Sequence, residues 1–321
     1  VDAMANQVAG YLVAEGVEPG DRVALTCPNL PYFPIVYYGI LKAGGVVVPL
    51  NVLNKGRENA YYLEDSGAKV YFCFQGTPEL PMGQEGHAGF EAAESCGRFV
   101  MITAELGAPS PIEGVPTLVD ALTGRSPQFE TVMRDETETA VILYTSGTTG
   151  RPKGAMLTHL NIVHSALHYE ACMRLQRGDR SALAVPASHV TGLVAIIVAM
   201  WRVAGCVVIV PEFKAAPFVE LLVRERISHT LMVPAMYKLC LLAEGFEQAD
   251  LSAWRVGGYG GAPMPVATID ELSARVPSLE LLNCYGATET TSPTTMMPAG
   301  QGRAQADSVG VALPAGAIRV M

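Results

Sequence analysis

The stretch YTSGTTGRPKGAMLTH, which runs from Tyr144 to His159, differs in composition from the apolar sequence around it. No long apolar side chain lies between Tyr144 and Met156, so this part of the chain cannot pack a hydrophobic core. It follows the apolar run AVILY, which predicts a buried strand, and it precedes a helical pattern at residues 158–173. A polar loop that joins a strand to a helix is a common position for ligand binding in α/β proteins.

The residues of this stretch suit a polyphosphate ligand. Glycines leave backbone N–H groups accessible, hydroxyl groups add donors, and Lys153 adds a positive charge. The spacing is not that of the P-loop G-x-x-x-x-G-K-S/T, which cannot be aligned with GTTGRPKGA. A plain polar turn is the alternative, which the density of hydroxyl groups disfavours. The predicted phosphate-binding residues are Thr145, Ser146, Gly147, Thr148, Thr149, Gly150 and Lys153.

The composition indicates a globular protein. Of the 321 residues, 50% are hydrophobic and 17% are charged, so the chain can bury a large core. Acidic residues outnumber Lys and Arg by 31 to 22, which gives a net charge of −9. Because nucleic-acid binding normally requires a basic surface, we expect no nucleic-acid partner.

Cysteine usage and the length of the apolar runs bear on the compartment. The seven cysteines include no C-x-x-C pair, which favours free thiols in a reducing cytosol and predicts a cytoplasmic protein. The longest apolar run, VTGLVAIIVAMW, is followed by Arg202 and falls short of the roughly 20 residues that span a bilayer. We therefore expect no transmembrane segment.

Helical and strand-like patterns alternate along the chain. In the first part, the expected helices are 2–15, 32–42 and 57–65, and the expected strands are 22–27, 46–50 and 69–74. Residues 103–137 are rich in Pro, Gly, Ser and acids, with a short helical pattern at 118–122, and are interpreted as a connection between two sheets. The strands expected beyond it are 140–144, 182–186, 206–210, 229–234, 254–258 and 279–286. The helices expected among them are 158–173, 192–203, 217–226, 235–243 and 265–274.

Short apolar strands separated by helices predict mostly parallel sheets that are covered on both faces. The predicted fold class is α/β, with two stacked, mostly parallel sheets and helices on their faces in a layered αβαβα arrangement. We expect a first α/β subdomain at residues 1–135 and a second at 136–321, which carries the nucleotide site. Ligands of such sheets bind beyond the carboxyl ends of the strands, so the site is expected at that edge of the second sheet.

A family resemblance rests on four motifs in order. YTSGTTGRPKGAMLTH closely resembles the phosphate-binding signature of the adenylate-forming ligases, which include acyl-CoA synthetases, peptide-synthetase adenylation domains and beetle luciferase. The other three motifs are LKAGGVVVPLN from Leu41, GGAPMP from Gly260 and NCYGATET from Asn283. The resemblance implies the large N-terminal domain of an acyl-CoA synthetase, which would use ATP and CoA as co-substrates and Mg²⁺ as a cofactor.

The resemblance also implies roles for individual residues. Lys153 and the loop hydroxyls would hold the β- and γ-phosphates of ATP, and Thr288 the α-phosphate. Tyr285 would pack on adenine, and Glu289 would be the Mg²⁺ ligand, in keeping with the preference of Mg²⁺ for oxygen. The wall beside the purine and acyl group is assigned to Gly260, Gly261, Ala262 and Pro263, and the remaining nucleotide-binding residues are Asn283, Gly286 and Ala287. Without the neighbouring motif residues, the alternative interpretation is that Tyr285 is an ordinary core or edge aromatic residue and that Glu289 is a solvated acid.

Histidines supply one further candidate. His189 lies in VPASHVTGL and matches the histidine that CoA ligases of this family carry near the acyl carboxylate, so it is grouped with Lys153, Thr288 and Glu289 as catalytic. His164 and His168 have the i, i+4 spacing of a zinc pair. They lack the glutamate of H-E-x-x-H and a third ligand, so metal binding there is not expected.

The segment PASHVTG carries no acid that could pair with a substrate ammonium group, which favours a fatty or aryl acid and CoA as the acceptor. In the family, a ribose-binding aspartate, a hinge and a small C-terminal lid domain with the adenylation lysine follow after the last residue here. We therefore expect a fragment that is inactive alone. The alternatives are an acyl-AMP ligase that passes the acyl group to a carrier protein, and a non-catalytic nucleotide- or acyl-binding protein. Homodimer formation is left open.

Overall fold

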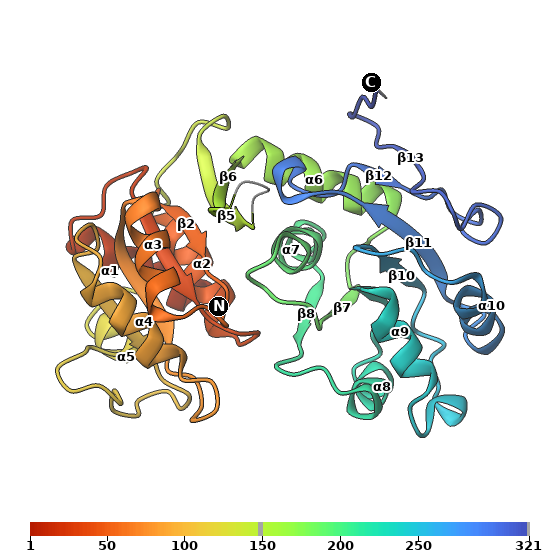
Figure 1. Cartoon of the computed structure of the whole chain (residues 1–321), viewed down its shortest axis with the longest axis horizontal. Coiled ribbons are helices and arrows are strands. Elements are labelled where there is room, and N and C mark those ends of the chain that lie inside the picture. The colour runs from red at the N-terminus through yellow and green to blue at the C-terminus, as the bar shows by residue number, and fades with distance from the viewer. Residues whose placement is uncertain (147–149, 320–321) are drawn as a thin grey trace. The chain divides into compact units, whose positions relative to one another are not determined.

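The computed structural model describes residues 1–146 and 150–319 (Figure 1). The chain divides into two compact units, residues 1–160 and 161–321. Each unit contains one sheet and its own helices, and each is described by itself below. Within the described ranges, no helix combines the length and the apolar character that crossing a membrane requires.

The first unit is built on a six-stranded sheet with the order β4-β3-β1-β2-β5-β6. All neighbouring strands are parallel except β5 and β6, which form an antiparallel hairpin. The strands are β1 (Arg22–Thr26), β2 (Val46–Pro49), β3 (Ala68–Phe74), β4 (Arg98–Ile102), β5 (Thr139–Thr145) and β6 (Lys153–Thr158). The helices are α1 (Asp2–Ala14), α2 (Tyr32–Lys42), α3 (Gly56–Ser66), α4 (Met82–Glu91) and α5 (Leu118–Leu122).

The second unit contains a seven-stranded sheet with the order β13-β12-β11-β10-β9-β7-β8. The strands from β11 to β8 are parallel, and β12 and β13 add an antiparallel edge. The strands are β7 (Arg180–Leu183), β8 (Cys206–Ile209), β9 (His229–Met232), β10 (Val256–Tyr259), β11 (Glu280–Tyr285), β12 (Thr295–Met296) and β13 (Val311–Ala312). The helices are α6 (His159–Cys172), a π-helix (Thr191–Val198) continued by α7 (Ala199–Arg202), α8 (Ala215–Arg224), α9 (Pro234–Leu241) and α10 (Val266–Arg275).

Apolar side chains of α8, α9 and α10 form a hydrophobic core in the second unit together with residues of the strands. Trp254 and Tyr237 are fully buried in it and stack with ring centroids 5.8 Å apart. The central strands β9 and β10 are buried along their whole length, as expected for parallel strands in a sheet that is covered on both faces. This packing fixes the strand ends, from which the loops of the candidate site emerge.

The prediction of an α/β fold with two mostly parallel sheets is confirmed. The predicted stacking of one sheet on the other concerns the relative placement of the units and stays a prediction. Along the chain, the first unit ends at residue 160, because β5 pairs with β2 through Val47 and Val141 and so belongs to the first sheet. The subdomain boundary predicted after residue 135 lies just before this strand. Strand β6 replaces part of the loop that the sequence predicted before residue 158.

Candidate functional site

The glycine-rich loop of the first unit is held between the two strands of a hairpin. Thr145 of β5 pairs with Lys153 of β6, and Tyr144 pairs with Gly154. This pairing brings the two ends of the loop together, with Ser146 on one limb and Gly150 on the other. The predicted phosphate-binding residues Gly147, Thr148 and Thr149 lie outside the described residues.

Two features of the hairpin follow from the identity of its residues. A Cβ atom at Gly154 would lie 2.6 Å from Cγ2 of Ile142 and 3.5 Å from the ring of Tyr144, so the strand can approach its partner only with glycine there. Gly150 has φ +96°, a conformation that side-chain-bearing residues rarely adopt. Lys153 follows the turn with an exposed side chain, which places a positive charge at the base of the loop.

Helix α3 contacts both limbs of this loop, which the sequence reasoning missed. The hydroxyl of Tyr144 donates to Oδ2 of Asp65 at 2.6 Å, and the hydroxyl of Tyr61 donates to the carbonyl oxygen of Pro152 at 2.9 Å. Burial, and then the neighbouring Asp65 carboxylate, raise the pKa of Tyr144 above its usual range. The only sequence signal was a pair of tyrosines, Tyr61 and Tyr62, in a helix that is mostly polar.

In the second unit, the predicted site residues gather at one edge of the sheet. Strands β7, β9, β10 and β11 are parallel neighbours, so their carboxyl ends point the same way (Figure 1). The segment with His189 follows β7, GGAP follows β10 and YGATET begins at the end of β11. The structure therefore places the three second-unit motifs at the same edge of the sheet, beyond the carboxyl ends of β7, β10 and β11.

The GGAP turn depends on its first two residues. A Cβ atom at Gly260 would clash with the carbonyl oxygen of Cys284 on the adjacent strand, so only glycine permits this close approach of β10 and β11. Gly261 follows with φ +77°. Ala262 and Pro263 are exposed, which leaves this turn open to a ligand.

The YGATET segment leaves the sheet as a short 3-10 helix, Thr288–Thr290. The backbone N–H of Ala287 donates to Oγ1 of Thr290 at 3.0 Å, which fixes the start of the helix. Tyr285 has 52% of its surface exposed, as a residue available for stacking requires. Glu289 is also exposed.

The structure gives both Asn283 and Gly286 a structural reason for their identity. The buried Asn283 donates from Nδ2 to the carbonyl oxygen of Ser308 at 2.9 Å, which ties β11 to the segment that leads into β13. A Cβ atom at Gly286 would lie 2.9 Å from Oγ of Ser292. The predicted nucleotide-binding role of both residues stays a prediction.

His189 is oriented by the start of the π-helix. Its Nδ1 atom accepts the backbone N–H of Thr191 at 3.2 Å and lies 3.2 Å from the Thr191 hydroxyl. Desolvation lowers the pKa of His189, which favours the neutral ring. Because Nδ1 accepts a hydrogen bond, the neutral ring carries its proton on Nε2 and can donate from there. A Cβ at Gly192 would clash with the carbonyl oxygen of Pro186, which explains glycine at that position. Local π-helix is frequent at functional sites.

The first-unit loop and the second-unit edge each contain predicted site residues. The loop offers a positive charge and hydroxyl groups, and the edge offers an exposed aromatic ring, a carboxylate and an imidazole. This combination of α/β fold, glycine-rich hairpin loop and strand-end motifs defines the adenylate-forming class of enzymes. A family model described as AMP-binding enzyme matches residues 1–321, and the chain belongs to that family.

Individual relatives agree with this assignment. The chain is 31% identical over 314 residues to the long-chain-fatty-acid–CoA ligase FadD13 of Mycobacterium tuberculosis, covering 97% of this chain and 58% of that protein. It is 32% identical over 284 residues to a feruloyl-CoA synthase of an Amycolatopsis species, covering 88% and 52%. The chain thus spans little more than half the length of these curated relatives.

A solved structure gives the same result for the fold. The inhibitor-bound crystal structure of the N-terminal domain of FACL13 from Mycobacterium tuberculosis matches with a TM-score of 0.85 and 29% identity. The match covers 97% of this chain and 74% of that one.

Proposed function

We propose that the protein containing this chain activates a carboxylic acid with ATP and then transfers the acyl group to CoA. The observation that carries this proposal is the gathering of the His189 segment, GGAP and YGATET at the carboxyl edge of one parallel sheet. Open α/β sheets bind their ligands at this edge. The names of the relatives, which are acid–CoA ligases and synthases, support the same reaction class.

The first step joins the acid to AMP. A carboxylate oxygen of the acid attacks the α-phosphorus of ATP, the bond from that phosphorus to the bridging oxygen breaks, and pyrophosphate leaves. In the second step the CoA sulfur attacks the acyl carbon, the bond to AMP breaks, and the thiol proton is released. Both steps bring anions together, so the site must neutralise charge as well as orient the reactants.

The residues of the chain suit these tasks. We assign Lys153 and the hydroxyls of Thr145 and Ser146 to the leaving phosphates, and Thr288 to the α-phosphate. Tyr285 is assigned to the adenine ring, because an exposed aromatic ring at a strand end can stack on a purine. The Nε2–H of His189 is assigned to the acyl carboxylate, where a neutral donor can orient an oxygen without forming a tight ion pair.

The carboxyl edge of the second sheet also offers a ligand suited to Mg²⁺. Glu289 offers an exposed carboxylate at the start of a 3-10 helix, and Mg²⁺ is commonly held by one or two carboxylates together with substrate phosphates. The ion would supply charge neutralisation for the departing pyrophosphate. Among the described residues, no group of three His, Cys, Asp or Glu is arranged to hold a metal without such a substrate.

We propose a fatty or aryl acid as the substrate. No acidic residue occurs between Pro186 and Gly192, so nothing in this segment could pair with the ammonium group of an amino acid. The π-helix that follows is apolar and largely buried. A long-chain-fatty-acid ligase and a feruloyl-CoA synthase are among the relatives, in keeping with either type of acid.

The test is pyrophosphate exchange into ATP by the full-length protein, with acids of graded length and aromaticity. Exchange is expected only when an acid and Mg²⁺ are both present, and CoA should then yield a thioester. Exchange without thioester formation would favour transfer to a carrier protein, and no exchange with any acid would favour a non-catalytic binding protein. We further propose that residues 1–321 alone are inactive, because the resemblance assigns the adenylation lysine to a later segment.

Lys153→Ala should lower the exchange rate strongly while leaving the melting temperature nearly unchanged, because an exposed lysine contributes little to stability. Lys69→Ala is the matched control, since Lys69 is also exposed in the first unit but lies near the start of β3, at the opposite edge of the sheet. A large loss of stability in Lys153→Ala would show that the residue is structural.

A further inference from the structure

We infer that Tyr61 and Asp65 of α3 are positioning residues for the phosphate-binding loop. They hold its two limbs in place before ATP arrives, although they lie far from the loop in the sequence. This inference rests on the proposed function, because it assumes that the loop binds the phosphates of ATP. All of the contacts that support it lie within the first unit.

Tyr61 fixes the limb that carries Lys153. Its hydroxyl donates to the carbonyl oxygen of Pro152 at 2.9 Å. That carbonyl belongs to the peptide unit that joins Pro152 to Lys153, and a peptide unit is planar. Holding the oxygen therefore fixes the direction of the Lys153 N–H and constrains the direction in which its side chain leaves the backbone.

Asp65 fixes the other limb through Tyr144. The Tyr144 hydroxyl donates to the Asp65 carboxylate at 2.6 Å, and a hydrogen bond to a charged acceptor is stronger than one between neutral groups. The ring of Tyr144 packs 4.5 Å from that of Tyr62 and 6.4 Å from that of Tyr61, measured between centroids. Tyr144 is followed directly by Thr145 and Ser146, the first two residues of the predicted phosphate site.

Helix α3 is itself held rigidly enough to act as a support. Tyr61 and Asp65 have i, i+4 spacing and so share one face. At the start of the helix, the backbone N–H of Lys55 donates to Glu58 at 2.8 Å. At its end, the Arg22 guanidinium donates to the carbonyl oxygens of Ser66 at 2.6 Å and Gly67 at 3.1 Å, which ties the helix to β1.

Limbs that are held in place before binding do not have to be positioned by the ligand, so loss of either hydrogen bond should weaken ATP binding. One hydrogen bond to a neutral group corresponds to roughly a two- to tenfold change in affinity, and one to a charged group to more. The binding of the carboxylic acid should not change, because neither residue is assigned to it.

The experiment compares Tyr61→Phe with Tyr62→Phe in the full-length protein. Both variants keep an aromatic ring in the same cluster, but only Tyr61 has a hydroxyl that is hydrogen-bonded to the loop within the described residues. Tyr61→Phe should raise the Kd and KM for ATP by roughly three- to tenfold. It should leave the KM for the acid and the melting temperature nearly unchanged, and Tyr62→Phe should resemble the unchanged protein in all four measurements.

Two further variants separate positioning from a general structural role. Asp65→Asn keeps a side-chain oxygen that can accept the hydrogen bond from the Tyr144 hydroxyl, so this variant should retain most of the ATP affinity. Asp65→Ala removes the acceptor and should bind ATP more weakly. In a Lys153→Ala background, Tyr61→Phe should have almost no further effect on ATP affinity, because it acts through the lysine limb. Equal ATP affinity in Tyr61→Phe and Tyr62→Phe, or fully additive effects of Tyr61→Phe and Lys153→Ala, would overturn the inference.

Calorimetric ATP titration distinguishes failure of the inference from failure of the proposed function. If the unchanged protein binds ATP but catalyses no pyrophosphate exchange with any of the acids tested, the proposed function fails. The ATP affinities of the variants then still decide the inference. If the unchanged protein does not bind ATP, both are overturned.

Discussion

At the scale of single residues, Gly260 shows how one missing side chain shapes the candidate site. Its backbone lies so close to the Cys284 carbonyl that a Cβ atom cannot be accommodated. We expect Gly260→Ala to force β10 and β11 apart and to lower the free energy of unfolding by about 1 to 3 kcal/mol, as overpacking does. Urea unfolding followed by circular dichroism would measure this change.

Gly10→Ala is the matched control for that substitution. Gly10 lies within α1, and a Cβ atom there would meet no other atom within 4 Å. Because alanine favours helix over glycine by about 1 kcal/mol, this variant should be as stable as the unchanged protein or more so. A Gly260→Ala variant of unchanged stability would show that the strands can separate there without cost.

The predicted site residues differ in how well the sequence could place them. The position of Gly260, Tyr285 and Glu289 at strand ends could be predicted because their motifs are local and follow the patterns of β10 and β11. Tyr61 and Asp65 could not, because their contacts with the loop depend on the three-dimensional approach of α3 to β5, which no local pattern encodes. Long-range hydrogen bonds of this kind become visible only in the structure.

At the scale of elements, α9 is attached to the second sheet by a buried hydroxyl. Tyr237 donates to the carbonyl oxygen of Gly258 at 2.7 Å, and Thr230 lies 3.0 Å from the same hydroxyl. We expect Tyr237→Phe to leave these buried groups short of a partner and to lower the free energy of unfolding by about 1 to 3 kcal/mol. Thermal and urea unfolding would test this.

The exposed Tyr285 provides the comparison for Tyr237. Tyr285→Phe should leave stability within about 0.5 kcal/mol of the unchanged protein, as surface substitutions usually do. If both phenylalanine variants unfold at the same urea concentration, the hydroxyl of Tyr237 does not attach α9 to the sheet.

Most elements were predicted from periodicity, and two of those that were missed, α4 and β6, have identifiable causes. Helix α4 contains three glycines, which lower helix propensity and hid the pattern. The structure explains two of them, because a Cβ atom at Gly86 would lie 2.5 Å from Sγ of Cys73 and one at Gly89 would lie 2.5 Å from Cβ of Asn59. Strand β6 was read as loop because its sequence, KGAMLT, becomes a strand only by pairing with β5.

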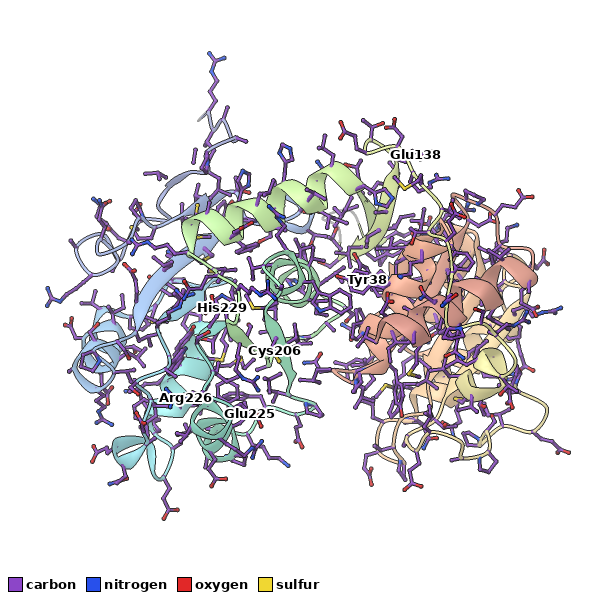
Figure 2. All side chains as sticks on the ribbon, turned by 180° about the vertical axis from the view of Figure 1, so that it is seen from behind. Tyr38, Glu138, Cys206, Glu225, Arg226 and His229 are labelled. Atoms are coloured by element: carbon purple, nitrogen blue, oxygen red, sulfur yellow. The ribbon has the colours of Figure 1, made fainter. Side chains whose placement is uncertain are left out.

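At the scale of the whole molecule, one buried histidine should make stability depend on pH. His229 has no exposed surface, and its ring lies in the interior of the second unit (Figure 2). Nδ1 lies 2.8 Å from the Ser181 hydroxyl and Nε2 lies 3.2 Å from the sulfur of Met173. Burial lowers the pKa of His229 to about 4, helped by Arg255 and opposed by Asp179.

The sign of the effect follows from these protonation states. Between pH 6.5, the usual pKa of histidine, and pH 4, the unfolded chain binds a proton that the folded chain does not. Stability therefore falls as the pH is lowered through this range, by about 1.4 kcal/mol per pH unit at most, and this term levels off below pH 4. Above pH 6.5, His229 contributes no pH dependence.

Urea unfolding at several pH values would measure this dependence. His229→Gln should be less stable at neutral pH but should show a shallower loss of stability between pH 6.5 and pH 4. A slope in His229→Gln equal to that of the unchanged protein would exclude His229 as the source.

The pairing of Val47 with Val141 has a consequence for the order in which the first unit folds. Strand β5 joins β2 only after the chain has passed through β3, β4 and the long connection that follows them. Closing so large a loop costs chain entropy, so contacts between distant residues form slowly. We therefore expect the β5–β6 hairpin to dock onto β2 late in the folding of the first sheet. Under the proposed function, nucleotide uptake by a newly made chain would then report that this sheet is complete.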